Sequence, residues 1–451
     1  MLRIGPAGSR RGFLRVASAG MLAGAQGLTT QGLRAETDAT KPGHSVIVVF
    51  CHGGPSQYET FDPKPDAPSD IKTVVGTIPT AIPGQRFGEH FPLLATRAGQ
   101  ILNVRSYVPG DANHDLKPLV CQASGMANLG SVYASVSGLQ TREGLPSNVF
   151  LHPASVGEKR ANPFMGPDQV GVTGSFPKAT APFVPGGEGN LLRDMKLRLD
   201  PGRFAERRNL LASLDGLERQ LDLEGSDGVR ERALRVLLGD VGEAFDLKRE
   251  SPKVLERYDT ANLVSEASIP TKWNNHNFYK EHVKSLGKLM LMARRLVERG
   301  TGFVAVNTAF VWDNHSDVNN APMKDAMPWL APVLDKALSA LLDDLSERGL
   351  REKVLVVVCG EMGRTPRVNE KGGRDHWGNL GPLLLSGGPI GTGGIYGQSS
   401  RDGSNPSALP VTIPDVLGTI FGHLWDMPRL RLRTDIGRDL VKILAYEGLR
   451  T

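Results

Sequence analysis

The chain has 451 residues, of which 40% are apolar and 22% are charged. This is the composition of a folded globular protein, and it excludes a disordered chain, a collagen and a coiled coil. The net charge is +5, but residues 1–35 contain five arginines and no acidic residue. Removing these five from the 53 Lys and Arg leaves 48, which is also the number of Asp and Glu. The rest of the chain is neutral overall, which argues against a nucleic acid or an anionic membrane as partner.

The N-terminal segment has the pattern of an export signal. Residues 9–15 read Ser-Arg-Arg-Gly-Phe-Leu-Arg, and a weakly apolar Gly/Ala-rich run follows as far as Leu28. This pattern resembles a twin-arginine signal peptide, which we expect over residues 1–35. The run is too short and too weakly apolar to span a membrane. We therefore expect the twin-arginine translocase to deliver residues 36–451 to the periplasm or the cell exterior; the alternative is a basic, disordered N-terminus.

The chain contains three cysteines, Cys51, Cys121 and Cys359, each in or beside an apolar run. A sparse, odd set of cysteines is not a disulfide framework. We expect buried thiols that pack as small apolar side chains.

Next, the apolar runs predict the elements of the fold. Strands are expected at Ser45–Phe50, Ile101–Tyr107, Phe303–Asn307, Lys353–Cys359 and Pro382–Leu385. Helices are expected at Glu89–Ala98, His114–Gly125 and Pro332–Arg348, with a helical insertion at about 194–299. Strands that alternate with helices indicate an α/β fold, here a three-layer, doubly wound and mostly parallel sheet.

Polar side chains follow the expected strands, where an open parallel sheet binds its ligands. The groups are His52 with Ser56 and Lys64, then His114, then Asp313 with His315, then Glu361 with Arg364, and finally Asp375 with His376. Imidazole and carboxylate donors without thiolate suit a catalytic divalent metal. Any single histidine beside a glycine turn also fits a capping or core role.

From this pattern we predict one or two divalent metal ions, with zinc, manganese, calcium and magnesium not distinguished. The candidate ligands are His52, Asp313, His315, Glu361, Asp375 and His376. Cationic residues near the same strand ends suit a phosphate or sulfate group, and they are Lys64, Arg364, Lys371 and Arg374. The alternative for each cation is a solvated loop charge.

Several longer motifs resemble a known family. They are GGPSQYETFDPKP (Gly53–Pro65), LMARRLVERG (Leu291–Gly300), WDNHSD (Trp312–Asp317), LDDLSERGL (Leu342–Leu350), GEMGRTPRVN (Gly360–Asn369), GGRDHWGN (Gly372–Asn379) and GGPIGTGGIYG (Gly387–Gly397). Together they resemble the family called domain of unknown function 1501, which is similar to the alkaline phosphatase and sulfatase superfamily. The resemblance covers nearly the whole mature chain and implies a dinuclear metal core on a doubly wound sheet.

The resemblance also implies roles for individual positions. The superfamily's first metal-binding Asp corresponds to Cys51-His52, its middle Asp and His to Asp313 and His315, its Asp-His-Gly to Glu361-Met362-Gly363, and its final His to His376. The helix that carries the nucleophile in sulfatases corresponds to the segment that begins at His114 and ends at Ser124-Gly125. No Cys-x-Pro-x-Arg motif is present, which argues against formylglycine chemistry.

Our leading hypothesis is therefore an exported, metal-dependent hydrolase of phosphate or sulfate esters. His114 would act as covalent nucleophile, general base or further ligand, with Ser56 as a weaker alternative nucleophile, while Arg364 and Lys64 would hold the anion. The alternative is a non-catalytic protein that binds an anionic glycan or a partner on a degenerated hydrolase fold. A third possibility is a metal-stabilised structural protein.

Overall fold

The computed structural model describes residues 39–157, 167–186 and 241–449. The expected export signal and residues 194–240 of the expected helical insertion lie outside these ranges. The centre of the fold is an eight-stranded sheet in the order β11-β4-β10-β7-β1-β6-β5, with β14 paired to β4. These strands are β1 (Ser45–Phe50), β4 (Ile101–Val108), β5 (Asn148–Leu151), β6 (Phe303–Asn307), β7 (Val354–Cys359), β10 (Gly381–Ser386), β11 (Gly394–Tyr396) and β14 (Val411–Thr412).

The sheet is mostly parallel, as the sequence predicted. β1 pairs in parallel with β6 and β7, and the pairs β5–β6, β11–β4 and β14–β4 are also parallel. Only β10 runs against its neighbours β4 and β7. Because β10 reverses the direction twice, β4 runs the same way as β1, β6 and β7.

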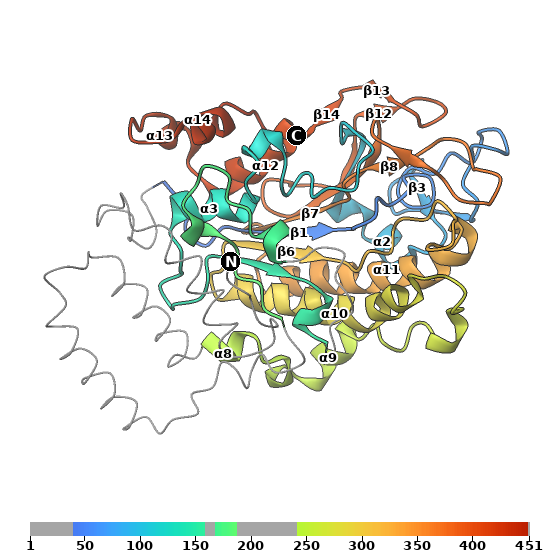
Figure 1. Cartoon of the computed structure of the whole chain (residues 1–451), viewed down its shortest axis with the longest axis horizontal. Helices are drawn as coiled ribbons and strands as arrows, with labels where there is room; N and C mark the ends of the chain where they lie inside the picture. Colours follow the sequence, from blue (N-terminus) through green and yellow to red (C-terminus); the bar gives the residue numbers. More distant parts are fainter. Residues whose placement is uncertain (1–38, 158–166, 187–240, 450–451) are drawn as a thin grey trace, which may run out of the picture.

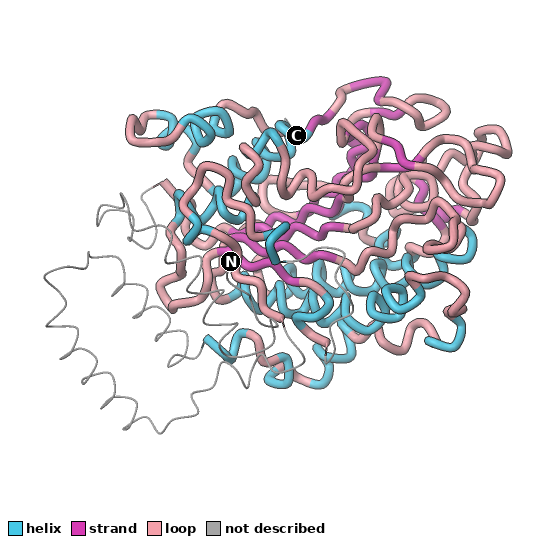
Figure 2. Tube along the Cα trace, in the orientation of Figure 1, coloured by secondary structure: helices cyan, strands magenta, loops and turns pink. Residues whose placement is uncertain are grey.

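Helices cover both faces of the sheet (Figures 1 and 2). Within the described residues the α-helices are α2 (Pro92–Thr96), α3 (Leu129–Ser137), α4 (Pro167–Val170), α8 (Val241–Ala244), α9 (Pro252–Tyr258), α10 (His276–Glu298), α11 (Met323–Glu347), α12 (Ile413–Leu424), α13 (Met427–Arg431) and α14 (Arg438–Leu444). In Figure 1, α10 and α11 lie below the sheet, whereas α3 and α12–α14 lie above it. The three-layer α/β architecture is therefore confirmed.

Each face of the sheet has its own apolar core. In β1, Ile47 and Val49 belong to the core between the sheet and helices α10 and α11, while Val46 and Val48 belong to the core between the sheet and helices α3 and α12. All six residues of β1 are buried. This explains why the strand reads as a continuous β-branched run rather than an alternating one.

The three central parallel strands end together. Phe50, the last residue of β1, is in register with Asn307 of β6 and with Cys359 of β7, and these are also the last residues of their strands. The loops that follow these strands therefore begin at one edge of the sheet. This alignment gives the polar residues after each strand a common place to meet.

The helix expected over His114–Gly125 is absent, and that expectation was wrong. The segment is a loop that ends in a short 3-10 turn, Gln122–Ser124, closed by Gly125 in the left-handed region. Two aspartates compete with helical hydrogen bonding: Asp111 accepts from the amide of Asn113, and Asp115 accepts from the amide of Lys117. Pro118 also disfavours helical backbone at the residue before it.

Two other helices differ in their bounds from the expectation. α11 begins at Met323, nine residues before the expected start, and continues through Pro328 and Pro332. A proline inside a helix costs about 3 kcal/mol, but the first turns also bury apolar residues such as Met327 and Leu330. The expected Glu89–Ala98 helix is shortened to α2, followed by a 3-10 turn at Ala98–Gln100. Within the expected insertion, the described part contains α8, α9 and α10.

Smaller two-stranded pairings complete the fold. They are β2 (Thr77–Pro79) with β3 (Arg86–Gly88), β8 (Gly363–Arg364) with β9 (His376–Trp377), and β12 (Gln398–Ser399) with β13 (Pro406–Ala408). In the β8–β9 hairpin, Arg364 stands opposite His376. Among the described helices, none combines the length and apolar character needed to cross a membrane.

Candidate metal centre

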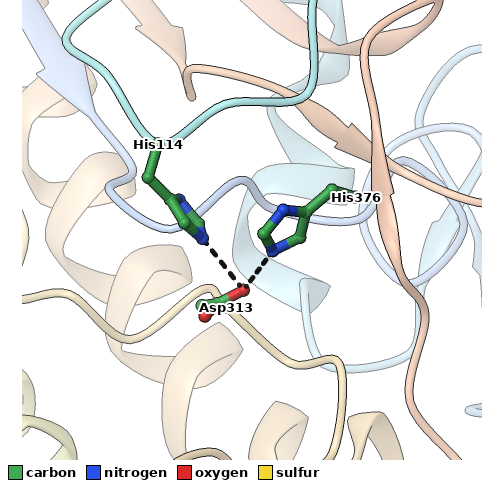
Figure 3. Close-up of side chains that lie close together, drawn as sticks. All are labelled: His114, Asp313 and His376. Carbon is green, nitrogen blue, oxygen red and sulfur yellow. Dashed lines mark hydrogen bonds and ion pairs between the residues drawn. The ribbon is translucent and has the colours of Figure 1, made fainter.

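Three side chains from segments far apart in sequence lie close together (Figure 3). His114 follows β4, Asp313 follows β6, and His376 lies in β9. One ligand atom from each lies within 4.8 Å of the others. The Nε2 atoms of both histidines point to the same oxygen, Oδ1 of Asp313, at 3.4 Å for His114 and 3.0 Å for His376.

This geometry fits a divalent cation. In a tetrahedral site with bonds of about 2.0–2.1 Å, neighbouring donor atoms lie about 3.3 Å apart, which is close to the two distances measured to Asp313 Oδ1. Three protein donors leave a fourth position open, as catalytic sites require. The side chains of His114 and His376 are 18% and 31% exposed, whereas Asp313 is only 5% exposed. The carboxylate of the cluster is therefore buried, while its two imidazoles are partly accessible to solvent.

Glu361 orients His114. Its Oε1 lies 2.9 Å from Nδ1 of His114, and the same carboxylate accepts the backbone amide of Gly53 at 2.9 Å. Glu361 is fully buried. A neutral His114 that donates from Nδ1 to Glu361 presents the lone pair of Nε2 toward Asp313, and a carboxylate behind a histidine is a common way to orient a metal ligand.

Further donors surround the Asp313 carboxylate. Arg364 Nη2 donates to Oδ1 at 2.8 Å, while His315 Nε2 and Asn320 Nδ2 lie 3.1 Å and 3.0 Å from Oδ2. The Arg364 side chain has no exposed surface and also donates to the carbonyls of Gly53 and Gly54. Arg364 therefore connects the loop after β1 to the loop after β6.

These contacts shift the protonation of the cluster. Burial opposes ionisation of Asp313, but hydrogen bonds from His114, His315 and His376 outweigh it and hold the pKa of Asp313 well below its usual range. Burial likewise opposes protonation of His114, yet its hydrogen bonds to Asp313 and Glu361 raise its pKa to about 9. The hydrogen bond to Asp313 raises the pKa of His315. Without a metal, the cluster therefore holds protons near neutral pH.

His52 lies beside this cluster in an apolar setting. Its ring stacks on Phe50, with centroids 5.6 Å apart, and meets Phe310 edge-on at 4.7 Å. Burial lowers the pKa of His52 to about 4. Phe310 also packs edge-on against His114, with ring centroids 4.9 Å apart, so both imidazoles contact the same aromatic ring. The three-residue cluster does not include His52.

Two other candidates have different partners. Asp375 is exposed, and its Oδ1 accepts from Nδ2 of Asn369 at 3.0 Å. Ser56 is buried, and its hydroxyl donates to Glu59 while accepting the amide of Tyr58. The structure therefore does not bring Asp375 into the three-residue cluster, and it directs the Ser56 proton to Glu59.

Two more of the candidate anion-holding cations, Lys64 and Arg374, are bonded to protein groups. Lys64 Nζ lies 2.9 Å from Oδ2 of Asp62 and donates to Oγ of Ser399, while Arg105 Nε approaches Asp62 Oδ1 at 3.3 Å. Arg374 is fully buried against Glu59. Lys371 is exposed, which is consistent with a solvated loop charge.

Sequence reasoning missed some groups that shape the site. Phe310 and Asn320 flank the WDNHSD motif, but neither residue type signals metal chemistry. Glu59 sits within the GGPS motif region and gave no signal because its partner, Arg374, is more than 300 residues away. Their roles depend on how loops pack, which local spacing does not encode.

The cysteines behave largely as expected. Cys51 and Cys359 are buried, Cys121 is half-buried, and all three are free thiols. Burial raises the pKa of Cys359 to about 12 and that of Cys51 above its usual value. These thiols are protonated at neutral pH and belong to the core.

Together, the fold and the cluster define an α/β protein with a histidine and carboxylate site at the carboxyl edge of its sheet. The family model described as "Protein of unknown function (DUF1501)" matches residues 43–434. The chain belongs to this family. A comparison with curated proteins gave no match.

Solved structures with a similar fold were also found. The PsFucS1 sulfatase from Pseudoalteromonas sp. is 12% identical, with 97% of this chain and 74% of that chain covered and a TM-score of 0.32. The phosphonate monoester hydrolase of Agrobacterium radiobacter is 10% identical, with 84% of this chain and 73% of that chain covered and a TM-score of 0.34. A protein in the alkaline phosphatase superfamily from Vibrio parahaemolyticus is 10% identical, with 89% of this chain and 77% of that chain covered and a TM-score of 0.31. Likeness at this level transfers neither an activity nor the role of any residue.

Proposed function

We propose that this protein is an exported, metal-dependent hydrolase of phosphate or sulfate esters whose metal centre is built on His114, Asp313 and His376. The proposal rests on the position of the two histidines, whose Nε2 atoms both lie near Oδ1 of Asp313 (Figure 3). Two neutral imidazoles and one carboxylate, without thiolate, suit a hydrolytic metal ion. When bound, such an ion supplies a Lewis acid for the ester oxygen and lowers the pKa of a water molecule.

The surrounding residues prepare the ligands. Glu361 holds the proton on Nδ1 of His114, so that Nε2 is the donor atom. Arg364 fixes Asp313 through Oδ1 and ties it to the loop after β1. In this proposal Arg364 is a positioning residue rather than the anion clamp that the sequence suggested, because its guanidinium is fully buried among protein acceptors.

His315 is the proposed proton donor to the leaving group. Its Nε2 contacts Oδ2 of Asp313, on the side of the carboxylate away from the oxygen shared by His114 and His376. The side chain is 26% exposed, and the hydrogen bond with Asp313 raises its pKa. A partly exposed imidazole with a raised pKa beside the centre suits a general acid.

The second candidate function is binding of an anionic glycan or a partner without catalysis. It is favoured by the absence of a Cys-x-Pro-x-Arg nucleophile motif and by the Ser56 hydroxyl, which is buried and donates to Glu59. In this case binding would persist after chelation and in a His114→Ala variant.

A paired assay separates the two. The purified, metal-reconstituted protein is tested on a panel of aryl phosphates and aryl sulfates, together with His114→Ala, His376→Ala and the control His276→Ala, a residue on α10 outside the cluster. The proposal predicts hydrolysis by wild type and the control, and loss by a factor of at least about 100 in both cluster variants. Hydrolysis that survives in both cluster variants, or none by the wild type, contradicts it.

A further inference from the structure

We propose that the buried ion pair between Glu59 and Arg374 is a positioning element that sets the place of His376 in the metal centre. This inference rests on the proposed metal centre, and it concerns residues that touch neither metal nor substrate. Glu59 and Arg374 are both fully buried, and both lie in loops at the carboxyl edge of the sheet.

Arg374 uses its whole guanidinium to join loops. Nε and Nη2 contact the Glu59 carboxylate at 3.0–3.2 Å, Nη2 also donates to the carbonyls of Ile71 and Lys72 at 2.9 Å, and Nη1 donates to the carbonyls of Thr365 and Pro366. The guanidinium carbon lies 4.3 Å from the centre of the Tyr58 ring. Every face of the cation is thus satisfied by protein groups, which a ligand-binding arginine would not show.

The Glu59 carboxylate is also fully hydrogen-bonded to protein groups. Besides Arg374, its carboxylate accepts the hydroxyl of Ser56 and the amide of Val74. The pair therefore joins the loop after β1, the segment around residues 71–74 and the loop that leads to β9. A buried carboxylate with these donors has a single favourable geometry, because any displacement leaves a charge without a partner.

The pair is close to His376 along the chain. Arg374 precedes His376 by two residues, and its backbone is held on both sides: its amide donates to the carbonyl of Asn314 at 3.2 Å, and its carbonyl accepts from Nη1 of Arg364. Arg364 also stands opposite His376 in the β8–β9 hairpin and donates to Asp313. Movement of Arg374 would therefore move His376 relative to Asp313.

A buried ion pair is a poor device for stability alone, because well-packed apolar residues stabilise a core as well or better. It fixes geometry more strictly, and a metal site needs its ligands placed within about 0.5 Å. This explains why two opposite charges are buried beneath the loop that carries His376.

The test compares Glu59→Gln and Arg374→Lys with wild type, using Co²⁺ as the probe. Asp344→Asn is the matched control, because Asp344 forms a similarly buried pair with Arg294 between α10 and α11. Two quantities are measured on the full chain: the Co²⁺ dissociation constant with its visible absorption spectrum, and amide hydrogen exchange of residues 364–376 in the chelated protein.

We expect Co²⁺ binding to weaken by about 10–100-fold in both variants, with an altered spectrum, while the control keeps the wild-type values. Exchange at 364–376 should rise in the two variants and stay unchanged in the control. Wild-type spectra and exchange in Glu59→Gln and Arg374→Lys would overturn the inference, as would an equal rise in the control. Failure of the wild type to bind Co²⁺ would instead contradict the proposed function, and the exchange measurement would still decide the positioning role.

Discussion

Raising the pH of the chelated protein should remove stability that His114 supplies. Its pKa is raised to about 9 in the folded protein, against 6.5 for an ordinary histidine. A raised pKa means that the folded state binds the proton more tightly than the unfolded state. The contribution is therefore fully present below about pH 6.5 and is lost as the pH rises through about 9.

The size of the effect follows from the shift. A pKa difference of about 2.5, at about 1.4 kcal/mol for each pH unit, corresponds to about 3.5 kcal/mol as an upper value. His315, whose pKa is also raised by Asp313, acts in the same direction. Asp313 does not oppose it over this range, because its carboxylate is ionised in both states above about pH 5.

The assay is urea unfolding followed by tryptophan fluorescence at about pH 6 and about pH 10, with a chelator present. His114→Gln provides the comparison, since it removes this titration but leaves the other ionisable groups. We expect the wild type to lose more stability than the variant between the two pH values, by up to about 3.5 kcal/mol. Parallel losses in the two proteins would refute the account of His114.

Three further substitutions test separate parts of the structure. Asp313→Asn should lower the free energy of unfolding of the chelated protein by about 3–5 kcal/mol, since it leaves the buried Arg364 without its charge partner. A change below about 1 kcal/mol, measured by urea unfolding, would count against this role of Asp313. Gly53→Ala should destabilise the protein by about 1–3 kcal/mol and weaken Co²⁺ binding, because φ of Gly53 is +113° and a Cβ there would lie 2.6 Å from the amide nitrogen of Asp313. The control is Gly99→Ala, because a Cβ added at Gly99 meets no atom within 4 Å. Equal effects in the two variants would exclude this explanation. Burial raises the pKa of Asp335 to about 6, so the stability contributed by its bound proton is present below about pH 4 and lost as the pH rises through 6. The Asp335→Asn variant should therefore gain stability relative to wild type by up to about 3 kcal/mol between about pH 4 and pH 7. A difference in the free energy of unfolding that stays constant over this pH range would be inconsistent with this account.

The sequence predicts the sheet well because each central strand is a short, continuous β-branched run. The bounds of β1 and β6 match the expectation, and that of β7 differs by one residue. The sequence also places His114, Asp313 and His376 after predicted strands, and the carboxyl ends of parallel strands lie at one edge of the sheet. The meeting of side chains from distant segments is thus partly encoded in topology.

The detailed roles were not predictable from the sequence. Whether Arg364 holds a substrate or Asp313 depends on the direction of its guanidinium, which is set by carbonyls in the loop after β1. The loop before Gly125 looks helical by spacing, but Lys117 Nζ lies among the oxygens of Asp111, Asn113 and Asp115 and holds an irregular turn. Such contacts form only once the chain is folded.

The most direct test of the central claim is anomalous X-ray diffraction from crystals of the protein loaded with Co²⁺. We predict one anomalous peak bounded by Nε2 of His114, Oδ1 of Asp313 and Nε2 of His376, at about 2.0–2.2 Å from each. A peak at other residues, or no peak in crystals soaked well above the solution dissociation constant, would contradict the proposed metal centre.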